Sequence, residues 1–151
     1  MDNKHAGKTT ILFLCTGNSC RSQMAEGWAK NLKADKIDAY SAGIEKHGLN
    51  PLAIKVMAEA GVDISFQYSK IIDELPVREF DWVITLCGHV NETCPFFPGK
   101  QIHHGFDDPP RLAAKATTEE EKLVAYRKVR DEIREYISSL PESLGTISPV
   151  V

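Results

Sequence analysis

The stretch ILFLCTGNSCRSQMAEGW, residues 11–28, decides how this chain folds. Residues 9–15 form a near-continuous apolar run, which is typical of a strand covered on both faces of a sheet. The run ends at Cys15, and small or polar residues follow at once. Beyond them, Met24, Trp28 and Leu32 recur at helical spacing. The stretch therefore predicts a strand, a tight loop and a helix, with a cysteine where the strand ends.

The rest of the chain alternates between strand and helix patterns. Further strands are expected at residues 37–42, 81–87 and, more weakly, 100–106. One helix is expected from Asn50-Pro51 to Gly61, and a Thr118–Glu121 capping box starts a long final helix. The apolar stripe of that final helix consists of Leu123, Tyr126, Val129, Ile133, Tyr136, Ile137 and Leu140.

Strand–helix alternation with short connections is typical of α/β proteins with a parallel sheet. We predict a single α/β domain over residues 1–151, with a parallel four-stranded sheet flanked by helices, a folded core at 8–140 and a loose tail at 141–151. Right-handed crossovers bring the carboxyl ends of the strands to one edge, where such folds bind ligands. Cys15 and Cys87 each end a strand, so both are expected at that edge.

Composition narrows the class of protein. With 42% hydrophobic and 26% charged residues the chain is typical of soluble globular proteins, and its net charge of −3 argues against nucleic acid or an anionic membrane as partner. The apolar run at the N-terminus is too short for a signal peptide, and no stretch approaches a membrane span. We expect a cytoplasmic monomer, in which the four cysteines serve chemistry, metal binding or packing rather than permanent disulfides.

The loop from Cys15 to Arg21 has the features of an oxyanion site. Backbone N–H groups of a small-residue loop and of the following helix start can surround an anion, and an arginine fork matches two of its oxygens. Gly17 and Asn18 are residue types that tolerate the left-handed backbone such a loop needs. The predicted oxyanion-binding residues are Thr16, Gly17, Asn18, Ser19, Cys20, Arg21 and Ser22.

The same positive field favours the thiolate of Cys15, and a Ser22 hydroxyl could hydrogen-bond it, so we predict Cys15 as the nucleophile. The alternative is a buried, inert thiol followed by an ordinary turn. The thiol of Cys20 is expected to face the helix and to have a structural role.

Three motifs carry a resemblance to a known family. CTGNSCRSQMAEGW at 15–28, SAGIEKHGLNP at 41–51 and GFDDPP at 105–110 resemble the thioredoxin-coupled arsenate reductases, which are built on the low-molecular-weight protein tyrosine phosphatase fold. The match runs from about Thr10 to the final helix. The loop motif alone is shared with the phosphatases, so it indicates the fold and the anion chemistry but not the reaction.

The resemblance implies a role for Asp108, directly before Pro109, as the general acid; a plain Asp-Pro turn is the alternative. It also implies a thiol relay in which Cys15 attacks arsenate and Cys87 then attacks Cys15, so that arsenite leaves and a transient Cys15–Cys87 disulfide forms. Cys94 next forms a Cys87–Cys94 disulfide, which thioredoxin reduces. No bound cofactor is implied, and phosphate or sulfate would compete with arsenate.

The spacing of Cys87 and Cys94 supports the relay, because six mostly polar residues separate them and so short a loop closes at little entropic cost. Two alternatives stay open for this pair. Both cysteines could simply pack, or they could bind zinc with His89, or with His103 and His104, although their spacing departs from the usual zinc pattern.

Members of this branch can hold a potassium ion through an asparagine, a glutamate, a serine and an aspartate. Asn18, Glu26 and Ser41 match the first three, but the fourth position is Lys70, so we predict no metal. Our hypothesis is that the Lys70 ammonium pairs with Glu26 in place of the ion; alternatively, Lys70 points into solvent.

Three functions are compatible with these residues. The leading hypothesis is a thioredoxin-dependent arsenate reductase, with a glutaredoxin-type reductant also open. The second is a low-molecular-weight phosphatase that hydrolyses phosphate monoesters, and the third is a non-catalytic oxyanion-binding redox sensor. Cys87 and Cys94 favour the first over the second, and Arg21 with Asp108 favours either enzyme over the sensor.

Overall fold

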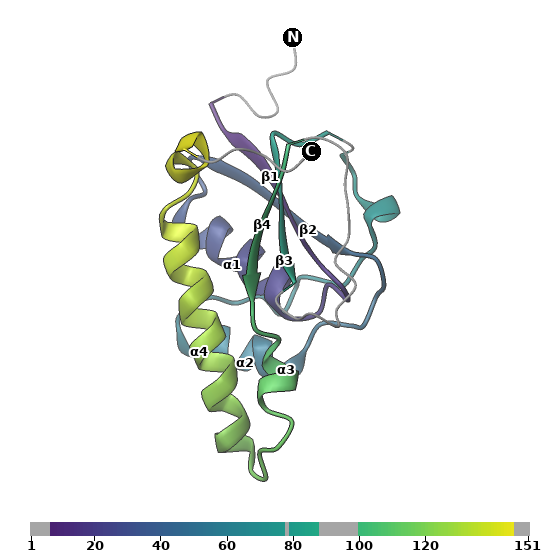
Figure 1. Cartoon of the computed structure of the whole chain (residues 1–151), viewed down its shortest axis with the longest axis vertical. Coiled ribbons are helices and arrows are strands. Elements are labelled where there is room, and N and C mark those ends of the chain that lie inside the picture. The colour runs from purple at the N-terminus through teal and green to yellow at the C-terminus, as the bar shows by residue number, and fades with distance from the viewer. Residues whose placement is uncertain (1–6, 78, 88–99, 147–151) are drawn as a thin grey trace.

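The computed structural model describes residues 7–77, 79–87 and 100–146. Its strands are β1 (Thr9–Cys15), β2 (Ile37–Gly43), β3 (Trp82–Cys87) and β4 (Gln101–Phe106). They form one sheet in the order β2-β1-β3-β4, and every neighbouring pair is parallel. The predicted parallel four-stranded sheet is confirmed, and the carboxyl ends of its strands meet at one edge (Figure 1).

Both faces of the sheet are covered, which explains the continuous apolar run of β1. Ile11 and Phe13 join the main hydrophobic core on one face. Leu12 and Leu14, which alternate with them, join a smaller cluster with Leu75 on the other face. Since successive side chains of a strand point to opposite faces, a strand buried on both sides shows no polar alternation.

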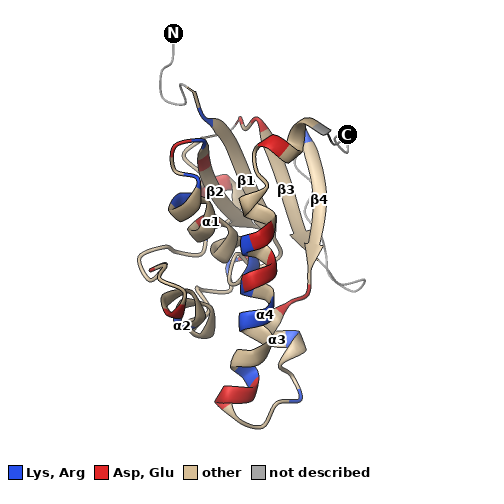
Figure 2. Cartoon of the chain, turned by 90° about the vertical axis from the view of Figure 1, so that its left-hand side faces the viewer, with Lys and Arg blue, Asp and Glu red and all other residues tan. Residues whose placement is uncertain are grey.

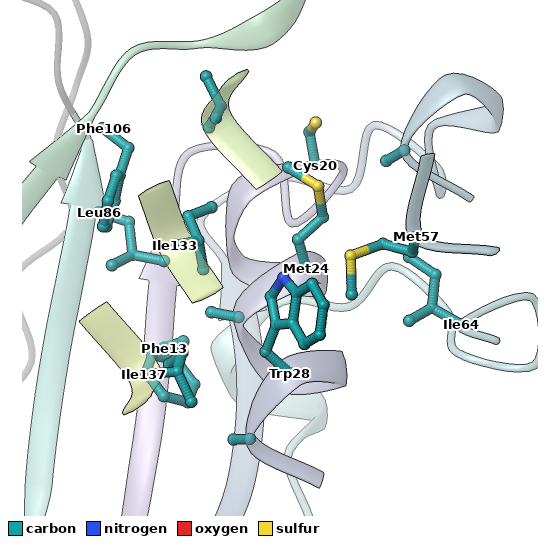
Figure 3. Packing of buried hydrophobic residues seen from close by; sticks show 14 of the residues in the cluster. Phe13, Cys20, Met24, Trp28, Met57, Ile64, Leu86, Phe106, Ile133 and Ile137 are labelled. Carbon is teal, nitrogen blue, oxygen red and sulfur yellow. The ribbon is translucent and has the colours of Figure 1, made fainter. Parts of the chain in front are cut away.

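Of the four α-helices in the described residues, three cover the face of the main core. The helices are α1 (Arg21–Leu32), α2 (Pro51–Glu59), the short α3 (Pro109–Leu112) and α4 (Glu119–Ser138). Figure 3 shows Met24 and Trp28 of α1 between Met57 of α2 on one side and Ile133 of α4 on the other. The buried residues of α4 are Leu123, Tyr126, Val129, Ile133 and Ile137. Acidic and basic residues, red and blue in Figure 2, occur along the same helix. Within the described ranges, no helix is both long and apolar enough to cross a bilayer.

The helix boundaries follow the capping signals in the sequence. Asn50 caps α2, because its Oδ1 accepts hydrogen bonds from the backbone amides of the two residues after Pro51 at 2.8 and 3.2 Å. Gly61, with φ of 88°, lies just beyond the end of the same helix. Thr118 and Glu121 form the expected capping box at the start of α4. These predictions are confirmed.

The chain after α4 differs from the expectation of a loose tail. Residues 142–146 form a short 3-10 helix, η2 (Glu142–Thr146), which follows the turn at Pro141. Leu144 is only 2% exposed and belongs to the main hydrophobic core. The loose tail expected from residue 141 therefore does not describe residues 142–146, because burial of Leu144 holds this turn on the core. A second 3-10 helix, η1 (Ile72–Glu74), borders the smaller cluster.

Candidate active site

The loop between β1 and α1 holds its carbonyl groups outward. The carbonyls of Thr16, Gly17 and Ser19 accept backbone hydrogen bonds of 3.0 or 3.1 Å from the segment that follows β2. The donors are the amides of Ile44, Glu45, His47 and Asn50. Since the N–H and C=O groups of one trans peptide unit point in opposite directions, these bonds turn the amides of the following residues toward the inside of the loop. Inward amides are what an anion nest requires.

Asn18 is the structural centre of this loop. It is fully buried, and its φ of 48° lies in the left-handed region that its residue type tolerates. Its Nδ2 donates hydrogen bonds to Ser22 Oγ at 2.8 Å and to Ser41 Oγ at 3.1 Å. Its Oδ1 accepts hydrogen bonds from the backbone N–H of Lys70 at 2.9 Å and from Gln23 Nε2 at 3.0 Å. These four bonds hold a backbone conformation that costs free energy by itself.

Two glycines at the loop allow close approaches and have no positive φ angle. The expectation that Gly17 adopts a left-handed backbone is wrong, because its φ is not positive. A Cβ at Gly17 would lie 2.2 Å from Nδ1 of His47, which packs against the loop. A Cβ at Gly43 would lie 2.7 Å from the carbonyl oxygen of Thr16 and 2.8 Å from the amide nitrogen of Asn18. The end of β2 thus supports the loop backbone directly.

Cys15 lies at the end of β1 with its thiol buried against Ser22. The distance from Cys15 Sγ to Ser22 Oγ is 2.9 Å. Ser22 Oγ accepts a hydrogen bond from Asn18, and its own proton can go to the sulfur, which as a thiolate can only accept. This contact holds the sulfur at the loop. The α1 helix begins at Arg21, directly after the loop, and the side chain of its N-cap residue Cys20 makes no capping hydrogen bond. Amides at a helix start are suited to bind an anion.

The Cys20 thiol belongs to the hydrophobic core. It is buried beside Met24 of α1 (Figure 3). Burial raises the pKa of the Cys20 thiol well above its usual value, and the nearby charges of Asp108 and Cys15 act in the same direction. A protonated thiol is a poor nucleophile, so the contribution of Cys20 to the loop is its backbone N–H.

Arg21 is held at the loop by the ends of two strands. Its Nη1 donates hydrogen bonds to the carbonyl of Phe106 at 3.1 Å and to that of Leu86 at 3.4 Å. The guanidinium is nearly buried. Strand ends of β3 and β4 therefore fix the plane of the group that would grip an oxyanion.

Asp108 is the acidic residue that faces the loop. Its Oδ1 lies 3.6 Å from Arg21 Nη2, and it precedes the first turn of α3 with its side chain partly exposed. The neighbouring Asp107 instead lies 3.9 Å from Lys128 on α4. Of the two adjacent acidic residues, Asp108 thus has the position from which a proton can reach a bound oxyanion.

Cys87 brings a second buried thiol to the loop. It ends β3, and its Sγ lies 4.0 Å from the side-chain oxygen of Thr16, the residue after Cys15. The pairing of β3 with β4 shifts register between Thr85 and Cys87, and such an irregularity re-aims the side chains beside it. Cys15, Cys20 and Cys87 are free thiols. Cys94 lies outside the described residues, and so does its predicted pairing with Cys87.

Glu26 and Lys70 meet beneath the loop. Lys70 Nζ lies 3.9 Å from Glu26 Oε1, and the side chains of both residues are buried. Ser41 Oγ donates a hydrogen bond of 2.5 Å to the same carboxylate oxygen, and Asn18 contacts Ser41. The structure thus brings together the residues at the four positions that the resemblance assigns to a potassium site, which are Asn18, Glu26, Ser41 and Lys70. The alternative that Lys70 points into solvent is wrong.

His103 and His104, which were considered as zinc ligands, contact other side chains. Nδ1 of His103 lies 2.8 Å from Thr85 Oγ1, and the His104 ring stacks on Tyr136 with ring centroids 3.9 Å apart. No group of three or more histidine, cysteine or acidic side chains within the described part of the chain could hold a metal ion. His89 lies outside that part.

Several residues that support the loop were not predicted from the sequence. Gln67 Nε2 donates to Gln23 Oε1 at 2.8 Å, and Gln23 in turn holds the side chain of Asn18. Ser69 Oγ donates to the carbonyl of Gly17 at 3.0 Å. These contacts join segments far apart in the sequence, and a glutamine or serine without a local motif gives no signal of such a role.

Comparisons with known proteins agree with this geometry. The family described as low molecular weight phosphotyrosine protein phosphatase matches residues 10–147. The chain is 52% identical over 145 residues to an arsenate reductase of Bacillus subtilis (strain 168), which covers 95% of this chain and 99% of the relative. It is 56% identical over 138 residues to an arsenate reductase of Bacillus licheniformis, covering 90% and 97%. A solved arsenate reductase in the phosphate binding state superposes with a TM-score of 0.67 at 34% identity, covering 93% of this chain and 99% of that one.

Proposed function

The chain belongs to the low molecular weight phosphotyrosine protein phosphatase family, and on this premise we propose that it reduces arsenate to arsenite with electrons from thioredoxin. The observation that carries the proposal is the second buried thiol, since Cys87 Sγ lies 4.0 Å from Thr16 Oγ1 at the loop of Cys15. Hydrolysis of a phosphate monoester needs one cysteine. Reduction needs two electrons, and a neighbouring thiol can supply them.

In the first step the loop amides and the Arg21 guanidinium bind arsenate, and the Cys15 thiolate attacks the arsenic atom. The hydrogen bond from Ser22 holds the thiolate in place. An As–O bond breaks as the S–As bond forms, and Asp108 supplies the proton with which the leaving oxygen departs as water. The product is a thiol–arsenate adduct in which arsenic is still pentavalent.

In the second step the Cys87 thiolate attacks the sulfur of Cys15. The S–As electron pair leaves with arsenic, which becomes trivalent arsenite, and a Cys15–Cys87 disulfide forms. Cys94 then attacks Cys87, so that a Cys87–Cys94 disulfide forms and the Cys15 thiolate is released. Two electrons and two protons from the dithiol of thioredoxin restore the starting state. No bound cofactor takes part in this sequence.

We further propose that the protein acts as a monomer in the cytoplasm, a compartment in which thioredoxin keeps thiols reduced. Phosphate and sulfate are expected to compete with arsenate, because all three are tetrahedral oxyanions of similar charge. The solved relative in the phosphate binding state supports this expectation at 34% identity.

Steady-state arsenite production with thioredoxin, thioredoxin reductase and NADPH tests the proposal. Cys15→Ser, Cys87→Ser and Cys94→Ser are each expected to stop turnover, because each removes one sulfur of the relay. Full turnover in Cys87→Ser and Cys94→Ser would contradict the relay.

A second candidate function is hydrolysis of phosphate monoesters, which the family match and the grouping of Cys15, Arg21 and Asp108 favour. This step does not use Cys87. Cys87→Ser is therefore expected to keep a weak hydrolysis of an activated aryl phosphate while arsenite production is lost. The same measurement separates both enzymes from an oxyanion-binding redox sensor, which would turn over neither substrate.

A further inference from the structure

Lys70 is a charged residue whose side chain is buried, which is rare for a lysine. Only 6% of the residue is exposed. Its Nζ donates a hydrogen bond to the carbonyl of Tyr68 at 3.1 Å, lies 3.9 Å from Glu26 Oε1 and lies 4.7 Å from the centroid of the Tyr68 ring. Burial lowers the pKa of Lys70, and the Glu26 carboxylate acts in the opposite direction. A buried ion pair contributes little net folding stability, because the cost of desolvating both charges offsets their attraction, so its position is not explained by stability alone.

A continuous series of polar contacts leads from Glu26 to the Cys15 thiol. Glu26 Oε1 can only accept, so Ser41 donates its proton to Glu26 and accepts from Asn18 Nδ2. The same Nδ2 group donates to Ser22, whose hydroxyl donates to Cys15 Sγ when that sulfur is a thiolate. The Glu26 carboxylate thus sets the direction of the contact with Ser41, and the Asn18 amide sets the direction of the next two.

The backbone of Lys70 reaches the same series from the other side. Its N–H donates to Asn18 Oδ1 at 2.9 Å, and its carbonyl accepts from the amide of Gly43 at 2.9 Å. Lys70 therefore contacts the loop and the end of β2 through its main chain, and α1 through its side chain. A displacement of this residue would turn the amide of Asn18.

We propose that Lys70 is a positioning residue, whose ammonium holds the Glu26 carboxylate in place so that the series through Ser41, Asn18 and Ser22 presents the Ser22 hydroxyl to Cys15 Sγ. The ammonium acts as a built-in counter-ion, and the loop needs no separate monovalent cation. The inference rests on the proposed function only in taking Cys15 as the nucleophile; oxyanion binding and thiol reactivity are its readouts.

Lys30 provides a matched control. Its Nζ pairs with the other oxygen of the same carboxylate, Glu26 Oε2, at 2.5 Å, but its side chain is 46% exposed. Lys70→Met and Lys30→Met remove the same charge beside the same carboxylate. Only the first removes a contact to the oxygen that accepts from Ser41.

The experiment measures the affinity of the reduced protein for inorganic phosphate by calorimetry, and the alkylation rate of Cys15 by peptide mass spectrometry. Lys70→Met is expected to weaken phosphate binding and slow alkylation by at least about threefold, as coupling within one network suggests. Lys30→Met is expected to stay within about twofold, as for an exposed pair. Lys70→Arg should keep most of the affinity. Potassium chloride should restore Lys70→Met more than sodium chloride of equal ionic strength, with no such difference in the wild type.

Unchanged phosphate affinity and alkylation in Lys70→Met would overturn the proposal, and so would equal losses in Lys30→Met. If potassium but not sodium raised the phosphate affinity of the wild type, the role of Lys70 as a built-in counter-ion would be overturned. If Lys70→Met does not fold, Glu26→Gln/Lys70→Met removes both charges and should show the same loss; wild-type affinity there would also overturn the proposal. Because these readouts need no arsenite turnover, failure of the proposed reaction would be seen separately.

Discussion

At Gly43 the site depends on the absence of a side chain. This residue pairs with Cys15 in the sheet, and a Cβ there would lie 2.7 Å from Thr16 O and 2.8 Å from Asn18 N. Gly43→Ala must therefore displace loop backbone, which re-aims its amides. Overpacking of this kind costs about 1–3 kcal/mol of folding stability. Each re-aimed amide also loses a hydrogen bond to the bound anion, which is worth about 1.5–3 kcal/mol, so we expect phosphate affinity to fall about tenfold or more in calorimetry.

Gly61→Ala is the control for this substitution. Gly61 has a φ of 88° and no atom within 4 Å of an added Cβ, so the variant should lose about 1–2 kcal/mol of stability from backbone strain. Its phosphate affinity should equal that of the wild type. Similar losses of affinity in the two variants would show that strain anywhere in the fold, rather than the loop contact, is responsible.

At the level of elements, β4 and α4 are joined by the stack of His104 on Tyr136. Burial lowers the pKa of His104 from its usual 6.5, and repulsion from His103 adds to the effect. The folded state therefore binds this proton less tightly than the unfolded state. Stability from the neutral imidazole is complete above pH 6.5 and is lost as the pH falls from there through the folded-state pKa.

His104→Phe keeps an aromatic ring for the stack and removes the titration. We expect the urea concentration at the unfolding midpoint of the wild type to decrease when the pH is lowered from 7.5 to 5. The midpoint of His104→Phe should decrease less. His104 is exposed, so the difference is expected to be modest. Equal shifts in both proteins would mean that acid sensitivity comes from other groups.

The regular elements could be predicted from local signals, and the short ones could not. The capping residues Asn50 and Thr118 marked the starts of α2 and α4, and the apolar runs marked the strands. The 3-10 helix η2 has no comparable signal, because it forms where Leu144 reaches the core left beside α4. Its position follows from tertiary packing rather than from propensity.

For the whole molecule, the sequence predicted which residues meet at the loop better than it predicted what each of them contributes there. Cys15 and Arg21 lie in one motif, and parallel topology brought Cys87 to the same edge. Gly17 was predicted for its backbone conformation, yet its φ is not positive, and what it makes is a close contact with the His47 ring. The orientation of Lys70 was left open, since one sequence does not show which side chains meet across segments far apart in the chain.

The whole molecule also bears a net charge of −3, which opposes an approaching oxyanion at long range. Attraction must therefore be local, from the inward amides, the start of α1 and the Arg21 guanidinium. Such a site acts over a short distance, because salt screens charges beyond about 8 Å at physiological ionic strength.

A single turnover of Cys94→Ser with arsenate, without thioredoxin, is the sharpest test of the attack of Cys87 on Cys15. We expect arsenite in an amount equal to the protein, together with a Cys15–Cys87 disulfide that peptide mass spectrometry detects. Arsenite release with both thiols still open to alkylation would contradict it.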